Sequence, residues 1–284
     1  MLYLTKHLTK NSAKNLALKK ASGFTLMEFI IVIIIMGVMS VGIAGFIKLS
    51  TQTYLNVTER DELLANARFS VERLNREVRN ALPNSMRETR SATTHCLEFV
   101  PIIASTVYSE IPVAPESAVD TLTVIPFQLP NITNPVVTVY PLNSTEVYQD
   151  HSLSSGKAFL ISEYPESTTV EGLDIMKLVN AVQFNEDSPT NRAYIFNLPV
   201  SYCLNGSTLT RYTGYDFNAA QLLPPFFVNG RNSLMAENIE FATSSFTLVP
   251  ASLKRNAVVQ IKLNFTRDGE QVVFDNAIHI NNIP

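Results

Sequence analysis

The chain has few charged residues, and those that it has are unevenly placed. Charged residues make up 17% of its 284 positions. This is below the average for soluble domains and indicates that part of the chain lies in lipid or in a packed assembly. Residues 1–23 hold five basic residues and no acid, so the remainder carries 22 − 5 = 17 basic and 25 acidic residues, a net charge of −8. Because nucleic-acid binding needs clustered Lys and Arg, we expect no nucleic-acid partner.

Familiar catalytic and ligand-binding motifs are also absent. The sequence contains no HExxH, GxSxG or GxGxxG pattern. Its four histidines are scattered, at His7, His95, His151 and His279. We therefore predict no enzyme activity, no catalytic residue, no cofactor and no metal site.

The N-terminal region lacks acids and proline. No acid precedes Glu28, no proline precedes Pro83, and five lysines lie within residues 1–27. Residues 29–47 form a run of 19 uncharged residues. As a helix this run would span about 28 Å, close to the roughly 30 Å hydrocarbon core of a bilayer. The lysines before it predict that its N-terminal end stays in the cytoplasm and that the rest of the chain is exported.

Neither a cleaved secretory signal nor an uncleaved signal anchor fully explains this apolar run. A cleaved secretory signal needs a small-residue site just after a short apolar core, and this apolar core is too long. An uncleaved signal anchor accounts for the lysines and the apolar run, but it leaves Glu28 without a role. A carboxylate at mid-membrane costs roughly 2.5–3.5 kcal/mol, so such a residue suggests a function. In the alternative interpretation Glu28 lies at the headgroup boundary, where the cost is small.

The residues around that carboxylate carry a resemblance. The stretch GFTLMEFIIVIIIMGVM, residues 23–39, resembles the class III signal of type IV pilins and type II secretion pseudopilins. The resemblance implies that residues 1–23 are a leader, which an inner-membrane prepilin peptidase removes between Gly23 and Phe24. It also implies that Phe24 becomes N-methylated. Glu28 would then pair with the α-amine of a neighbouring subunit and favour the correct axial register during assembly.

The residues after the signal predict one long helix. Because proline is absent before Pro83, residues 24–82 can run as a single helix, with a transmembrane segment at about 24–47. In its second part an apolar stripe recurs at spacings of three and four, which predicts docking on a sheet. The stripe consists of Leu64, Ala67, Val71, Leu74 and Val78. The opposite face carries the charged residues Arg60, Glu62, Arg68, Glu72, Arg73, Arg76 and Glu77, with Arg79 near it.

Composition changes at Pro83, since all 15 prolines lie in residues 83–284. Short apolar runs between turn signals predict a β-rich head there. The clearest strand alternates Val259, Ile261, Leu263 and Phe265 with polar residues, Asn264 included, and the Asp268-Gly269 turn predicts that the chain returns as a hairpin. Residues 104–120 and 141–158 are loop-like and polar, which is expected either of insertions or of a second small β subdomain. The predicted fold class is α+β, a long helix packed on an antiparallel sheet.

The two cysteines, Cys96 and Cys203, form no CxxC pair, which argues against a zinc ribbon. They could be two unrelated buried thiols. The membrane segment places this domain outside the cytoplasm, where thiols tend to be oxidised, so we predict a disulfide.

Segments of the head narrow the resemblance. ARFSVERLNREVRNALPNS (67–85), CLEFVPI (96–102), PVSYC (199–203) and LTRYTGY (209–215) resemble the O-type minor pilin of mannose-sensitive haemagglutinin pili. The C-terminal residues 258–284 also resemble J-type pseudopilins and W-type minor pilins. The resemblance implies a subunit of pilus assembly whose partners are other pilins, the prepilin peptidase and an inner-membrane assembly platform. It would reside in the bacterial inner membrane, with the head in the periplasm, and then in an extracellular pilus. A type II secretion pseudopilin and a tip-exposed adhesive head remain as alternatives.

Overall fold

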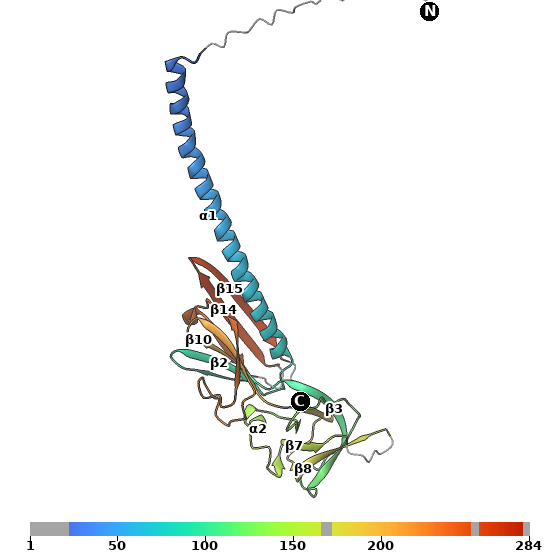
Figure 1. The fold of residues 1–284 in the computed structure, drawn as a ribbon. Helices are drawn as coiled ribbons and strands as arrows, with labels where there is room; N and C mark the ends of the chain where they lie inside the picture. Colours follow the sequence, from blue (N-terminus) through green and yellow to red (C-terminus); the bar gives the residue numbers. More distant parts are fainter. Residues whose placement is uncertain (1–22, 166–171, 251–255, 281–284) are drawn as a thin grey trace, which may run out of the picture. The chain divides into compact units, whose positions relative to one another are not determined.

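The computed structural model describes residues 23–165, 172–250 and 256–280 and divides the chain into two units, 1–58 and 59–284. The predicted leader lies outside the described residues except for Gly23. The helix α1, Leu26–Arg79, contributes its first part to one unit and its second part to the other (Figure 1). The fold is α+β, with a long apolar N-terminal helix and a mostly antiparallel β head, as the sequence predicts.

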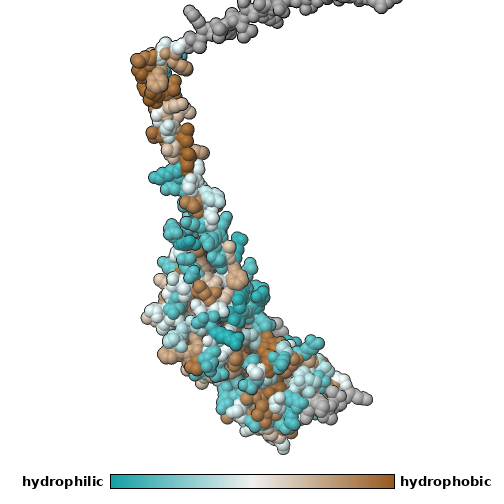
Figure 2. Space-filling view, viewed as in Figure 1, coloured by the Kyte–Doolittle hydropathy of each residue, from teal (hydrophilic) through white to brown (hydrophobic). Residues whose placement is uncertain are grey.

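The first unit consists of α1 and the residues before it. Every residue from 23 to 58 is exposed, including the apolar side chains between Phe24 and Ile47. Much of this stretch is brown in the hydropathy colouring of Figure 2. The helix is long and apolar enough to cross a membrane. The hydroxyl of Ser40 donates to the carbonyl of Met36 at 2.7 Å, so this polar group is satisfied within the helix.

The second unit begins with the amphipathic part of α1. Its buried stripe is Leu63, Ala67, Ser70, Val71, Leu74 and Val78. The predicted stripe is therefore wrong at its first position, because Leu63 is buried and Leu64 is only partly so. Both residues lie one turn before Ala67, and the sheet covers the side of the helix on which Leu63 lies. Ser70 is tolerated in this stripe because its hydroxyl donates to the Ala67 carbonyl at 2.9 Å.

Two antiparallel sheets form the part of the head that covers α1, here called the base. The first has the order β1-β2-β10-β11-β12 and the second β13-β14-β15. Their bounds are Arg87–Arg90 (β1), Thr94–Phe99 (β2), Val200–Asn205 (β10), Thr208–Thr213 (β11), Arg231–Ala236 (β12), Ser245–Val249 (β13), Val258–Arg267 (β14) and Glu270–His279 (β15). A short 3-10 helix, Phe241–Thr243, precedes β13. Side chains of α1 and both sheets meet in one apolar core.

The predicted C-terminal hairpin is confirmed. β14 and β15 pair along their whole length, and the turn residues Asp268 and Gly269 both have positive φ, as a tight two-residue turn requires. Val259, Ile261, Leu263 and Phe265 are buried as expected, but Asn264 is buried too. Its Nδ2 donates to Glu240 at 2.7 Å and to Thr243 at 2.8 Å, and these bonds offset part of the cost of burying it, whereas its Oδ1 has no hydrogen-bond partner among the described residues.

The remaining strands form a second β system. They follow the order β4-β3-β9-β5-β7-β8-β6, and β4 also pairs with β8, which closes six of them into a barrel. Their bounds are Ile102–Glu110 (β3), Val119–Val124 (β4), Val136–Val139 (β5), Ser155–Gly156 (β6), Ala158–Glu163 (β7), Asp174–Phe184 (β8) and Arg192–Phe196 (β9). A short helix α2, Ser144–Val147, lies between β5 and β6. Residues 104–110, which look loop-like in the sequence, belong to strand β3 and so to this second β system, one of the two possibilities that the sequence leaves open.

The barrel has its own apolar core, which includes Leu122, Val137, Phe159, Met176 and Ile195. None of the residues in this core belongs to the core of the base. Figure 1 shows β3, β7 and β8 grouped together, separate from β2 and β10. The head therefore contains two β modules within one chain.

Candidate functional site

The start of α1 holds the residues for which the sequence predicts processing. Gly23, Phe24 and Thr25 precede the helix without regular structure, and Phe24 is 82% exposed. The peptide bond between Gly23 and Phe24 therefore lies in exposed, non-helical backbone. A Cβ added at Gly23 would meet no atom within 4 Å, so the fold itself does not require glycine at this position.

Thr25 and Glu28 cap the helix reciprocally. The Thr25 backbone N–H donates to Glu28 Oε2 at 3.3 Å, and the Glu28 N–H donates to Thr25 Oγ1 at 3.2 Å. This is a capping box, which satisfies two N–H groups that a helix start leaves free. Thr25 was not among the predicted site residues, although its spacing T-x-x-E is itself the sequence signal for such a cap.

The capping box leaves Glu28 exposed at the end of an apolar surface. Glu28 is the only charged residue between Phe24 and Ile47. Within the described part of its own chain its carboxylate meets Thr25 and no cation. The carboxylate can therefore take a positive partner from outside the chain. The exposed apolar helix is compatible with a single-pass membrane anchor.

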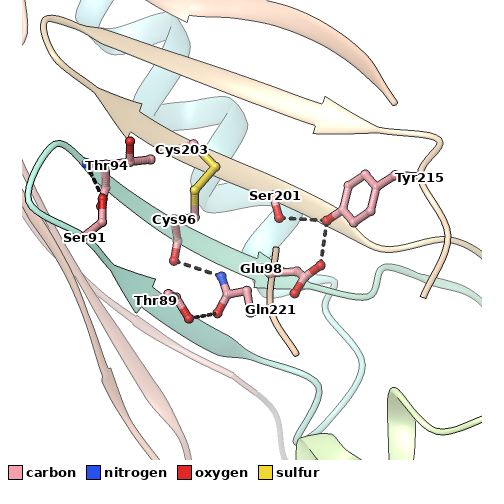
Figure 3. Close-up of a disulfide and its surroundings, with 9 residues drawn as sticks. All are labelled: Thr89, Ser91, Thr94, Cys96, Glu98, Ser201, Cys203, Tyr215 and Gln221. Atoms are coloured by element: carbon pink, nitrogen blue, oxygen red, sulfur yellow. Dashed lines mark hydrogen bonds between the residues drawn. A yellow bond between two sulfur atoms is a disulfide. The ribbon is translucent and has the colours of Figure 1, made fainter. Parts of the chain in front are cut away.

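The two cysteines are joined in a disulfide, as the sequence predicts. Cys96 in β2 and Cys203 in β10 lie directly opposite each other, with 4.1 Å between their Cα atoms (Figure 3). Such a short separation is typical of non-hydrogen-bonded pairs in antiparallel sheets. The bond spans a sequence separation of 107 residues. Closing a loop of that length stabilises the fold by about 4–5 kcal/mol in the chain-entropy model.

Residues 214–230, here called the strap, cover the face of the sheet on which the disulfide lies. Gln221 donates to the Cys96 carbonyl at 3.1 Å, and Arg87 donates to the carbonyls of Asn218 and Ala219. Phe227 packs with both cysteines in a small apolar cluster. The two sulfur-bearing residues are fully buried as a result.

A buried acid lies beside the disulfide on the same face. Glu98 accepts a hydrogen bond from Arg87. It also accepts one from the Tyr215 hydroxyl at 2.8 Å, and this hydroxyl hydrogen-bonds with Ser201 as well (Figure 3). Burial raises the pKa of Glu98, and the bonds from Arg87 and Tyr215 oppose that rise. Burial also raises the pKa of Tyr215. These hydrogen bonds fix the strap to the sheet.

A partly buried charge cluster joins the second part of α1 to the base. Glu77 accepts from Arg73 at 3.1 Å and from Arg211 of β11 at 2.8 Å, and its side chain is only 18% exposed. The sequence assigns Arg73 and Glu77 to the solvent face, and this is wrong. They border the buried stripe closely enough to face Arg211, a cation that no local helix pattern can reveal.

Within the described ranges no group of three or more His, Cys, Asp or Glu side chains could hold a metal ion. An open cleft of about 640 Å³ lies on the barrel and carries the exposed carboxylates Glu110, Glu116 and Asp187. The buried histidines His95 and His151 contact Glu88 and the Val147 carbonyl respectively. The prediction that the chain is not an enzyme stays a prediction.

Comparison of the chain with protein-family models, with curated proteins and with solved structures found no match.

Proposed function

We propose that this chain is a minor pilin of a type IV pilus, of the mannose-sensitive haemagglutinin type, that acts in pilus assembly or initiation. A prepilin peptidase cuts between Gly23 and Phe24, and Phe24 is methylated. The helix holds the subunit in the inner membrane with its head in the periplasm. It then packs beside the helices of other major and minor pilins, on an inner-membrane assembly platform, in an extracellular fibre.

One observation carries this proposal. An exposed bond at Gly23–Phe24 directly precedes a helix whose apolar side chains are all exposed up to Ile47 and whose one charge in that stretch is Glu28. A plain membrane anchor needs neither a glycine that the fold does not require nor a carboxylate at the start of the span. A subunit that is cut there and then packed against other helices has a use for both.

Processing can be tested with a matched pair of substitutions in the same chain. Gly23→Leu should abolish cleavage, because the added side chain would have to enter the peptidase site. Gly37→Leu makes the same chemical change in the apolar helix, where the structure also leaves room, and should be processed normally. Immunoblots of cells expressing each variant report the loss of the 23 leader residues. Normal processing of Gly23→Leu would contradict the proposed cleavage site.

The role of Glu28 can be separated from its role in the cap. Glu28→Gln keeps a side-chain oxygen for the Thr25 N–H, since Gln also serves in capping boxes, but it removes the charge. We expect the variant to be processed yet absent from sheared surface fibres. Recovery in fibres at the wild-type level would show that the negative charge is not needed for assembly.

Deletion of the chain separates the proposed role from its alternatives. Loss of surface pili supports a role in pilus assembly. Normal piliation together with loss of protein secretion would instead support a J-type pseudopilin. Normal piliation with loss of attachment would support an adhesive tip.

A further inference from the structure

The chain enters and leaves the barrel through two adjacent segments. β2 ends at Phe99, which pairs with Val200 at the start of β10. Ile102 at the start of β3 pairs with Phe196 at the end of β9. Residues 99–102 and 196–200 therefore run side by side from the base into the barrel, and we call them the neck. All six barrel strands lie between the two halves of the neck in sequence.

The two large cores lie on opposite sides of the neck. The core of the base draws its residues from positions 63–99 and 200–280, whereas the barrel core draws its residues from 108–195. Because the barrel is closed by the β4–β8 pairing, its six strands satisfy one another's backbone groups. A third, smaller cluster joins the two modules, because it contains Leu82 and the barrel residues Val136 and Tyr194, and Phe217 of the strap packs against it.

The disulfide lies at the base side of this neck. Cys96 is three residues before Phe99, and Cys203 is three residues after Val200, in the two strands that carry the neck. The cysteines belong to neither large core but to the cluster beneath the strap. Their bond therefore joins the two strands that would separate first if opening of the barrel were to spread into the base.

We infer that the barrel is a separately cooperative module inserted into the base and that Cys96–Cys203 is a clamp that confines unfolding of the barrel to the barrel. With the clamp closed, β2 and β10 stay paired when the barrel opens, so the sheet that covers α1 is kept. Without it, the base strands depend on the barrel to hold their ends together. This inference concerns the folding of the head and does not rest on the proposed function.

The inference is tested by hydrogen exchange and mass spectrometry on the full chain in detergent micelles. Ile195→Ala removes a fully buried side chain of the barrel core. In the disulfide-bonded chain it should lower the protection of β5 and β9 by about tenfold or more and leave β2 and β10 unchanged. In the Cys96→Ala/Cys203→Ala background the same substitution should also lower the protection of β2 and β10. Ile261→Ala, in the core of the base, is the control and should lower base protection in both backgrounds.

Two results would overturn the clamp. One is loss of protection in β2 and β10 on Ile195→Ala while the disulfide is intact. The other is equal protection of β2 and β10 in the two cysteine backgrounds carrying Ile195→Ala. If the double cysteine variant does not fold, the comparison of barrel and base protection is made in the disulfide-bonded chain alone, with Ile195→Ala and with the milder Ile195→Val. Loss of hydrogen-exchange protection in both the barrel and the base of that chain would contradict separate modules. Loss confined to the barrel would support separate modules.

Discussion

Residues 26–47 and 59–79 belong to the same helix, α1, but their surfaces differ. The first segment exposes apolar side chains on every face and carries Glu28 as its one charge. The second buries a single stripe against the base and carries charges on its other faces. The base thus covers the second segment, whereas no described residue of the chain buries the first. The comparison predicts that equal substitutions in the two segments have unequal consequences.

The largest difference is expected for truncation of one apolar side chain in each segment. Leu74→Ala should lower the free energy of unfolding of the second unit by about 2–5 kcal/mol, because Leu74 is fully buried. Ile34→Ala should leave that free energy unchanged, since Ile34 is exposed. Urea unfolding in micelles can be followed by tyrosine circular dichroism, because eight of the ten tyrosines lie beyond residue 58. Equal effects of the two substitutions would contradict the difference in packing between the two segments.

A smaller difference is expected for neutralising one acid in each segment. Glu77→Gln leaves Arg73 and Arg211 without their shared carboxylate and should cost about 1–3 kcal/mol in the same unfolding experiment. Glu28→Gln should cost the second unit nothing, because Glu28 contacts only Thr25 within the described residues. Arg68→Gln, at an exposed position of the second segment, is the control for a change of charge alone. A stable Glu77→Gln head would mean that the buried ion pairs contribute little.

The smallest effect is a pH dependence confined to the head. Burial lowers the pKa of His95 and of His151 in the folded state. The folded state therefore binds fewer protons than the unfolded state, and stability falls as pH drops below the unfolded histidine value of about 6.5. Thermal melts between neutral and mildly acidic pH should show this fall. Replacing both histidines by Gln should flatten the curve, and an unchanged slope would contradict the assignment.

Local signals in the sequence were sufficient for the helix and for the C-terminal hairpin. The absence of proline before Pro83 and the spacing of the apolar residues predict α1, although they place Leu64 where Leu63 is buried. The Asp268-Gly269 turn predicts the β14–β15 pairing. The disulfide is predicted from the expected export of the head, because an oxidising compartment favours a bond between Cys96 and Cys203.

The barrel and the strap depend on contacts that local patterns do not contain. Closure of the barrel requires β4 to pair with β8, about fifty residues later in the chain, and β3 lies in a stretch whose polar residues suggest a loop. Every residue of β2 is buried, Glu98 included, because the strap covers its outer face. Prediction of a strand from alternating apolar and polar residues requires one exposed face, and β2 has none.

We propose above that the leader is cut from the chain between Gly23 and Phe24, and that the exposed part of α1 then packs against the helices of other subunits. The most direct measurement is the mass of the N-terminal peptide of the chain isolated from the membrane and from sheared fibres. The claim predicts a peptide that begins at Phe24 and carries one added methyl group. A chain recovered only with residues 1–23 still attached, and never in the fibre fraction, would contradict it.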